Sequence, residues 1–159
     1  MIDLKTVLLN VLLVLSLNLS AQDVDCSMII DIDGRYYIDG EENLFTGTCV
    51  SCYGNGVVSY RATYFDGEIC GLCQWWHHNG QKKKEITYVL FEGKSLAEGY
   101  SYEWYRNGQL RVKERFKKGL RDGKWCKYDP DGKLIKRGVY ENGKHVSGDK
   151  IEEPKTSNR

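Results

Sequence analysis

The chain has 159 residues, and its 23 basic and 22 acidic side chains leave a formal net charge of +1. So balanced a charge creates no field that would draw the protein to nucleic acid or to anionic lipid, and the length suits one domain. Seventeen glycines, eleven tyrosines and only two prolines favour short strands and tight turns over helices.

Residues 1–21 have the pattern of a secretory signal peptide. Lys5 precedes an apolar run over 7–17 that only Asn10 interrupts, and the small residues Ser20 and Ala21 follow. Such a run is too short to cross a membrane, which takes roughly 20 residues. We expect cleavage after Ala21 and an exported mature chain without a membrane span, located in the periplasm, at the cell envelope or outside the cell. The alternatives are a buried apolar helix and an uncleaved anchor.

Residues 22–46 are expected to form an N-terminal arm. Within it, residues 28–46 suggest an imperfect hairpin that turns near Asp33-Gly34 and Asp39-Gly40. At the other end of the chain, residues 149–159 have the composition of a disordered tail.

Between arm and tail, a glycine register repeats four times and defines the units 47–70, 71–98, 99–122 and 123–148. Each unit begins at a glycine, and nine positions later comes a turn glycine that follows asparagine or aspartate. The turn glycines are Gly56, Gly80, Gly108 and Gly132. Asn-Gly and Asp-Gly favour two-residue hairpin turns in which both residues have positive φ. The register therefore predicts an all-β fold, an elongated single-layer antiparallel meander of about four hairpin repeats. Four extra residues over 90–98 predict a longer loop in the second unit.

The stretches "LFTGTCVSCYGNG", "GYSYEWYRNGQLRVKERFKKGLRD" and "GKWCKYDPDGKLIKRGVYENGKHVSG" carry a resemblance to the bacterial MORN-variant repeat proteins. The resemblance covers about 37–148 and implies a non-catalytic sheet scaffold that mediates association. Related chains are often labelled YwqK-type antitoxins, which implies an inhibitor of a partner toxin as an alternative function. Cys49 and Cys73 occupy the position at which Trp125 stands in the fourth unit, and Cys52 occupies the position of Trp76, Trp104 and Tyr128.

The two pairs Cys49–Cys52 and Cys70–Cys73 have a spacing typical of zinc sites, with 17 residues between them. Two-residue turns would place Cys49 and Cys73 on either side of Ala62 on one face, with Cys52 opposite Ser59. Cys52 and Cys70 would then point to the other face, so the four thiolates could not surround one metal ion. We therefore expect no metal and no cofactor, with a zinc-binding or thiol-redox protein as a third hypothesis.

Export would place all six cysteines in surroundings in which disulfides persist. The candidates are Cys26, Cys49, Cys52, Cys70, Cys73 and Cys126. Cys49 and Cys73 would lie about 9.5 Å apart across the intervening strand, too far for a bridge. Cys26, in the arm, has the greatest freedom to reach a partner among the cysteines of the first repeat. The sequence leaves the pairing open, and several of the six could be small core residues.

No catalytic constellation is visible, so we expect no enzyme. His77 and His78 are adjacent and would face opposite ways on a strand, and His77 shares the register of Tyr53 and Tyr105. The basic clusters 82–84 and 113–118 are interpreted as solvated strand faces. Trp75, Trp76, Tyr102, Trp104 and Tyr105 are the candidate binding residues, because aromatic patches on a single-layer sheet mark interaction sites. The leading hypothesis is an exported scaffold that binds a protein or a glycan.

Overall fold

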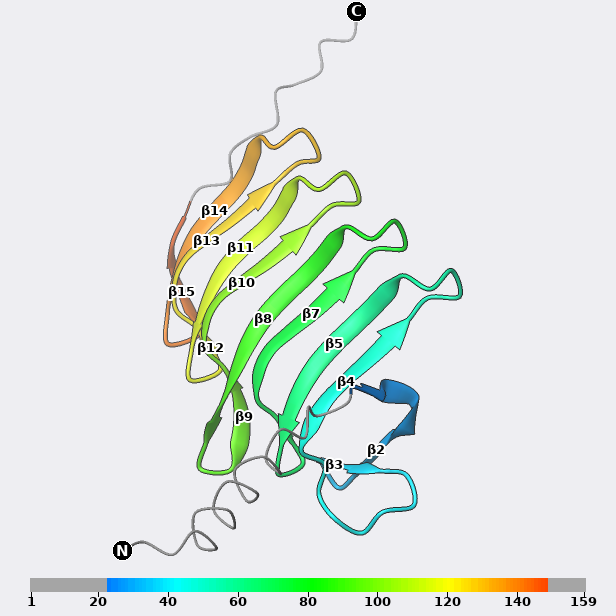
Figure 1. Ribbon diagram of the computed structural model, residues 1–159. Helices are drawn as coiled ribbons and strands as arrows, with labels where there is room; N and C mark the ends of the chain where they lie inside the picture. The colour runs from blue at the N-terminus through cyan, green and yellow to red at the C-terminus, as the bar shows by residue number, and fades with distance from the viewer. Residues whose placement is uncertain (1–22, 149–159) are drawn as a thin grey trace, which may run out of the picture.

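The computed structural model describes residues 23–148, so the predicted signal peptide and the predicted tail lie outside the described residues. The described chain forms one long sheet with a two-stranded hairpin beside it, and it contains no α-helix (Figure 1). The prediction of an all-β meander is confirmed. The elements are β1 (Val24–Asp25), the short 3-10 turn η1 (Cys26–Met28), β2 (Ile29–Ile32), β3 (Arg35–Ile38), β4 (Gly47–Cys52), β5 (Val58–Phe65), β6 (Glu68–Ile69), β7 (Gly71–Trp76), β8 (Lys82–Phe91), β9 (Lys94–Ala97), β10 (Gly99–Trp104), β11 (Leu110–Lys117), β12 (Leu120–Arg121), β13 (Gly123–Tyr128), β14 (Leu134–Glu141) and β15 (Lys144–Ser147).

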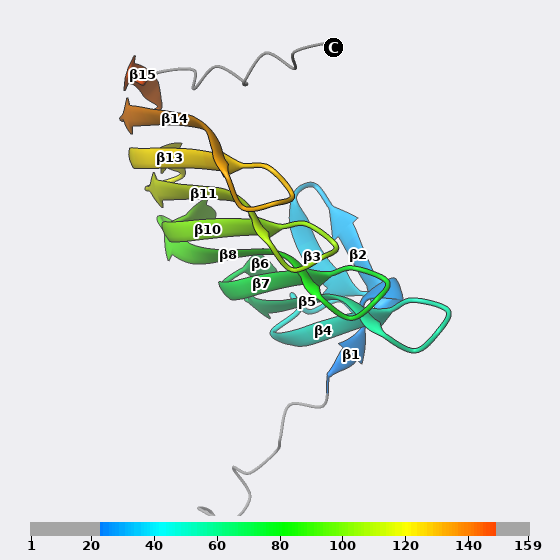
Figure 2. The ribbon, with the colours of Figure 1, turned by 90° about the horizontal axis from the view of Figure 1, so that it is seen from above.

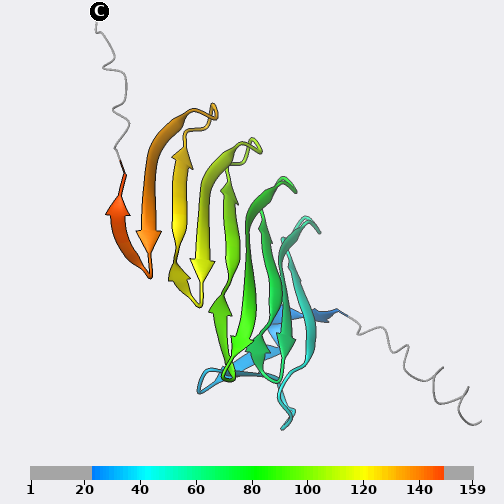
Figure 3. The same cartoon turned by 90° about the vertical axis from the view of Figure 1, so that its left-hand side faces the viewer.

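The long sheet keeps the order of the sequence. Its strands run β1-β4-β5-β7-β8-β10-β11-β13-β14-β15, and β6, β9 and β12 pair beside β5, β8 and β11. Neighbours are antiparallel except β1, which pairs with β4 in parallel and makes the sheet mixed. The strands β4, β7, β10 and β13 each begin at the glycine with which a repeat unit begins. Figure 3 shows the four hairpins following one another along the sheet.

The turns at one end of the strands, where β4, β7, β10 and β13 lead into the next strand, differ from the prediction. In the first unit the amide of Tyr53 donates to the carbonyl of Val57, and the amide of Gly56 donates to the carbonyl of Tyr53, both at 2.8 Å. Gly56 has a φ of 81°, whereas Asn55 has no positive φ. This geometry is a three-residue loop, a type I turn followed by a left-handed glycine, and not the predicted two-residue turn. The same amide pairs close the loops before Gly80, Gly108 and Gly132.

The longer loop changes the register only near the turn. Cys52 pairs with Val58 and not with Ser59, because the ladder is irregular between Ser51 and Cys52. Beyond this bulge Cys49 pairs with Ala62, as predicted. Two-residue turns do occur, but at the opposite ends of the strands. There a left-handed residue precedes each left-handed glycine, at Asp66-Gly67, Glu92-Gly93, Lys118-Gly119 and Asn142-Gly143.

The predicted longer loop in the second unit is also wrong. The extra residues lengthen both arms of the hairpin β8–β9, in which Phe91 pairs with Lys94 and Tyr88 pairs with Ala97. Dividing the insertion between both arms keeps the compact turn at Glu92-Gly93 and adds ladder hydrogen bonds, so the added backbone groups are satisfied.

Cross-strand pairing defines two faces of the sheet, since directly opposed residues share a face. The face that carries Cys49, Ala62 and Cys73 is called the core face, and the opposite one is called the open face. One row of the core face crosses all four hairpins and is buried from end to end apart from Trp125, which is half-buried. The row contains the pairs Cys49–Ala62, Cys73–Ile86, Ser101–Glu114 and Trp125–Gly138.

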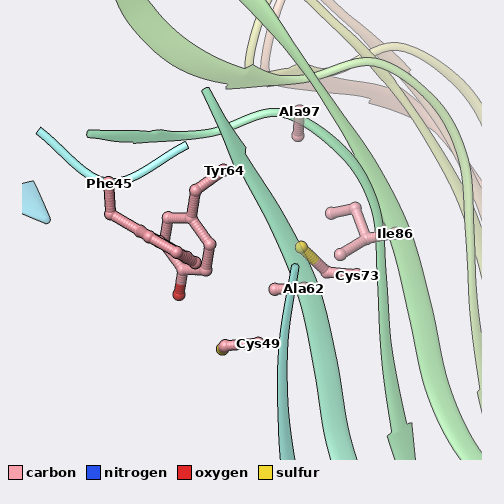
Figure 4. Close-up of a cluster of buried hydrophobic side chains, with 7 residues drawn as sticks. All are labelled: Phe45, Cys49, Ala62, Tyr64, Cys73, Ile86 and Ala97. Carbon is pink, nitrogen blue, oxygen red and sulfur yellow. The ribbon is translucent and has the colours of Figure 1, made fainter. Parts of the chain in front are cut away.

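The N-terminal arm covers the core face of the first two units only. The hairpin β2–β3 turns at Asp33-Gly34, as predicted, and lies to one side of the sheet at its N-terminal end (Figure 2). A disulfide joins Cys26 of the arm to Cys49 of β4. The rings of Tyr36 and Phe45 pack against Tyr64 with centroids 5.0 and 5.4 Å away. The buried apolar residues of this core come from β4, β5, β7, β8 and β9 and from Phe45, which precedes β4 (Figure 4).

Candidate binding face

The predicted binding residues do not share one surface. Trp75 lies on the core face, where its ring packs 5.0 Å from that of Tyr60, the residue directly opposite. Trp76, next in the chain, faces the other way. It pairs with Lys82, whose ammonium lies over the ring of Trp104 on the open face. Tyr102 and Trp104 share that face with Trp76, so the structure separates Trp75 from the other predicted aromatics.

Tyr105 serves to connect the units. Its hydroxyl donates to the carbonyl of Tyr128 in the next unit at 2.9 Å. The hydroxyl of Tyr53 donates in the same way to the carbonyl of Trp76 at 2.7 Å. In the second unit the Nε2 atom of His77 lies 2.9 Å from the carbonyl of Trp104, so this histidine replaces a tyrosine, as its register predicts. Each contact joins one unit to the next, and all three lie at the same end of the strands, near the three-residue loops.

The turn asparagines form a second connection between units. The side-chain amide of Asn55 donates to the carbonyl of His78 at 3.1 Å, that of Asn79 to Arg106 at 2.9 Å, and that of Asn107 to Pro130 at 2.8 Å. The sequence predicts these residues as turn formers only. Their recurrence one position before every turn glycine except the last is the signal that could have revealed the second role.

A row of three rings stands on the open face of β10. The centroids of Tyr100 and Tyr102 are 6.1 Å apart, and those of Tyr102 and Trp104 are 5.7 Å apart with an interplanar angle of 25°. The rings occupy alternate positions of one strand, which puts them on one side. Tyr100 is half exposed, at 50%, although it belongs to the middle of the sheet and not to a terminus.

Basic side chains cover these rings. The ammonium of Lys113 lies 4.8 Å from the ring centroid of Tyr100 and 5.7 Å from that of Tyr102. Lys82 lies 5.6 Å from the centroid of Trp104. These are cation–π distances. The ammonium groups therefore lie above the rings, on the solvent side of the open face. Both lysine clusters were expected to be solvated strand faces, but Lys82 and Lys113 lie over aromatic rings. The pairing of Lys113 with Tyr102 across β11 and β10 is the signal that predicts this association once the register is known.

The cysteines are distributed between both faces and do not converge. Cys49 is bonded to Cys26, while Cys52, Cys70, Cys73 and Cys126 are free thiols. Cys73 lies beside Ala62, because Arg61 pairs with Gln74, and burial raises the pKa of its thiol to about 11. Cys52 is exposed at the N-terminal edge. Within residues 23–148, no group of three or more histidine, cysteine, aspartate or glutamate side chains is arranged to hold a metal ion.

Comparison with known families agrees with this architecture. Residues 69–89, 97–118 and 121–142 match the model of the MORN repeat variant. These segments correspond to the second, third and fourth hairpins, so MORN-type units build this part of the sheet. No curated protein and no solved structure gave a match. Over the residues that the structure describes, there is no helix with the length and apolar character needed to span a lipid bilayer.

Proposed function

We propose that this protein is an exported, non-catalytic repeat scaffold that binds a protein partner through the open face of β10. The observation that carries the proposal is the row formed by Tyr100, Tyr102 and Trp104. Aromatic side chains left exposed on a soluble surface mark interaction sites, and tyrosine and tryptophan dominate binding energies at protein interfaces. The ring of Tyr100 is half exposed, and the ammonium of Lys113 lies over it.

The use of the two faces supports this assignment. The arm and the disulfide occupy the core face of the first two units, so that surface is committed to the fold. The open face keeps its rings in a regular array on a strand in the middle of the sheet. Binding residues carried by strands are held more precisely than those on loops, because ladder hydrogen bonds fix the backbone.

Export is supported by the N-terminal pattern and by the cysteines. The apolar run over 7–17 ends in small residues, as a cleaved leader does. The bond between Cys26 and Cys49 joins the arm to the sheet. A structural disulfide of this kind persists in oxidising compartments and is rare in the cytosol.

The test uses the mature protein and two matched variants as bait in an extract of the cell envelope. Tyr100→Ser removes a half-exposed ring from the row, and Phe91→Ser removes an exposed ring from the long hairpin of the second unit. We expect a partner that the wild-type protein and Phe91→Ser retain and that Tyr100→Ser loses by at least tenfold. Circular dichroism checks that all three proteins are folded. A partner that all three retain equally would exclude the β10 face.

Localisation is tested separately. Mass spectrometry of protein recovered from the native host should find an N-terminus at Gln22 and the Cys26–Cys49 bond in the exported fraction. Full-length protein that begins at Met1 and is confined to the cytoplasm would contradict export.

A further inference from the structure

We propose that the partner of the open face is an extended acidic segment with carboxylates at alternate positions, which docks along β11. This inference rests on the proposed function and adds to it the chemistry of the ligand. It is carried by four basic residues of the third and fourth units, Lys113, Arg115, Lys117 and Lys124.

The register places all four residues on the open face beside the rings. Arg115 is directly opposite Tyr100, and Lys113 is directly opposite Tyr102. Lys117 follows at the next alternate position of β11. Because Lys113 pairs with Cys126 across to β13, Lys124 lies beside Arg115 on the same face. Arg115, Lys117 and Lys124 are exposed, and Lys113 is half-buried over the rings.

No carboxylate in residues 23–148 forms an ion pair with any of these four side chains. The acidic groups nearby are directed to other cations: Glu114 accepts from Arg121 at 2.7 Å on the core face, and Glu85 accepts from Lys82 at 2.6 Å at the border of the rings. Two carboxylates border the cluster on this side: the amide of Asp122 donates to the carbonyl of Arg115 at 2.8 Å, and Glu98 accepts from the amide of Lys118 at 2.8 Å. The four cations therefore outnumber the neighbouring carboxylates and form no ion pair within the described chain, although the whole protein is almost neutral.

The spacing of the charges specifies the shape of the ligand. Lys113, Arg115 and Lys117 occupy alternate positions of one strand, so their attachment points are roughly 6.8 Å apart. An extended peptide with glutamate or aspartate at every second residue has the same repeat on one of its faces. Such a strand, lying along β11, would bring a carboxylate to each cation while its remaining side chains contact the ring row.

The covered rings argue against a neutral sugar. Stacking of a sugar needs a free ring face, whereas Lys113 lies over Tyr100 and Tyr102, and Lys82 lies over Trp104. An incoming group meets ammonium groups before it meets aromatic carbon. Carboxylates complement that outer layer, because a lysine held over a ring can donate hydrogen bonds outward.

The test titrates the full mature protein with a fluorescein-labelled ten-residue peptide of alternating glutamate and threonine at low salt. Control peptides carry glutamine in place of glutamate, or the same five glutamates in one block. The protein variant Lys113→Gln/Arg115→Gln/Lys117→Gln removes the charges along β11. Its matched control, Lys127→Gln/Lys133→Gln/Lys136→Gln, removes the same charge from the core face and a turn.

We expect the alternating glutamate peptide to bind the wild-type protein at least tenfold more tightly than the glutamine peptide, since an exposed ion pair contributes up to about fivefold and several act together. The β11 variant should lose at least tenfold and the matched control less than threefold. The block peptide should bind several-fold more weakly, and added salt should weaken binding.

Equal binding by both protein variants, equal binding of the alternating and block peptides, or no binding at all would overturn the inference. Heparin oligosaccharide or single-stranded DNA of equal charge binding as tightly would also overturn it, by showing general attraction of polyanions. A partner from the envelope extract that requires Tyr100 but tolerates the β11 variant would leave the proposed function standing and remove only the acidic ligand.

Discussion

The first two units and the last two share one backbone pattern but are stabilised by different means. At equivalent core-face positions the first pair carries Cys49 and Cys73, and the second pair carries Ser101 and Trp125. The small cysteines leave room for the arm, which supplies apolar contacts and a disulfide. In the last two units the row is satisfied by polar contacts, since Ser101 donates to the carbonyl of Glu85 and Glu114 accepts from Arg121.

This difference shows that a MORN-type hairpin fixes the ladder and leaves the core face adaptable. A single layer of hairpins buries little apolar surface, so each unit depends on its neighbours or on an added layer. The arm provides that layer at one end. At the other end the core face is more polar, and the open face carries the rings and the basic residues. The stabilising contacts and the proposed binding surface therefore lie in different halves of one sheet.

Removal of the disulfide should have the largest effect, and it should destabilise the first two units more than the last two. In Cys26→Ala/Cys49→Ala we expect the free energy of unfolding to fall by about 3 kcal/mol, because a bridge over 23 positions restricts the unfolded chain and also holds the arm in place. Denaturant unfolding measures the loss. Hydrogen exchange should accelerate in β4, β5 and β7 and stay nearly unchanged in β13 and β14. Cys126→Ser, a free thiol in the last unit, is the control, and uniform acceleration along the sheet would contradict the division into two halves.

High pH should loosen the first two units before the last two. Burial raises the pKa of Cys73 from 9.0 to about 11, and it also raises the pKa of Tyr60, Tyr64 and Tyr88 in the same core. Each group is neutral when protonated, and the folded state holds its proton more tightly than the unfolded state does. Their contribution is fully present below pH 9 and is lost as the pH rises through the folded values.

The measurement is hydrogen exchange or near-ultraviolet circular dichroism between pH 8 and 11. In the last two units Tyr128 is the tyrosine whose pKa burial raises, so β13 and β14 should respond less. Cys73→Ala is a matched variant, because it removes the group whose ordinary pKa, 9.0, is the lowest of the four while retaining a small apolar side chain. An onset of opening at the same pH in both halves would contradict the expectation.

Much of this architecture could be predicted from the glycine register, because four copies of one spacing specify the number, order and direction of the hairpins. Asn55 shows where prediction failed. Asn-Gly usually indicates a two-residue turn, but here the side-chain oxygen of Asn55 accepts from the amide of Val57 and its amide reaches the next unit, which suits a three-residue loop. Contacts between units depend on which turns lie side by side, and the sequence of a single turn does not show this.

The candidate site was predicted only in part, for a similar reason. Aromatic residues can be counted from the sequence, but the face to which each one points depends on bulges. Trp75 and Trp76 are neighbours on one strand, so their side chains point to opposite faces. Tyr100, which was absent from the prediction, instead forms one row with Tyr102 and Trp104. The pairing of Cys26 with Cys49 also required the arm to be placed, since the spacing of cysteines along the chain allows many combinations.

The hydrogen bonds between units should contribute equally to stability in both halves, unlike the disulfide and the buried core. Tyr53→Phe and Tyr105→Phe each remove a hydroxyl that donates to the carbonyl of the following unit. We expect each change to lower the free energy of unfolding by about 1 kcal/mol, the usual net value of a neutral hydrogen bond. Urea unfolding of the two variants gives the measurement. A loss at Tyr53 alone would show that the first half depends on these contacts and the second half does not.

The smallest effect is expected at the last turn, where the connection has no following unit among the described residues. Asp129 and Asp131 stand at the positions of Tyr105 and Asn107, and Asp129 accepts from the amides of Asp131 and Lys133 within its own turn. Asp131→Asn should therefore change the free energy of unfolding by less than about 0.5 kcal/mol, as for most exposed substitutions. The reciprocal change Asn107→Asp removes the donor to Pro130 and should cost about 1 kcal/mol. Equal effects of the two substitutions in urea unfolding would mean that the asparagines act through the shape of their own turns, because only Asn107 reaches a neighbouring unit.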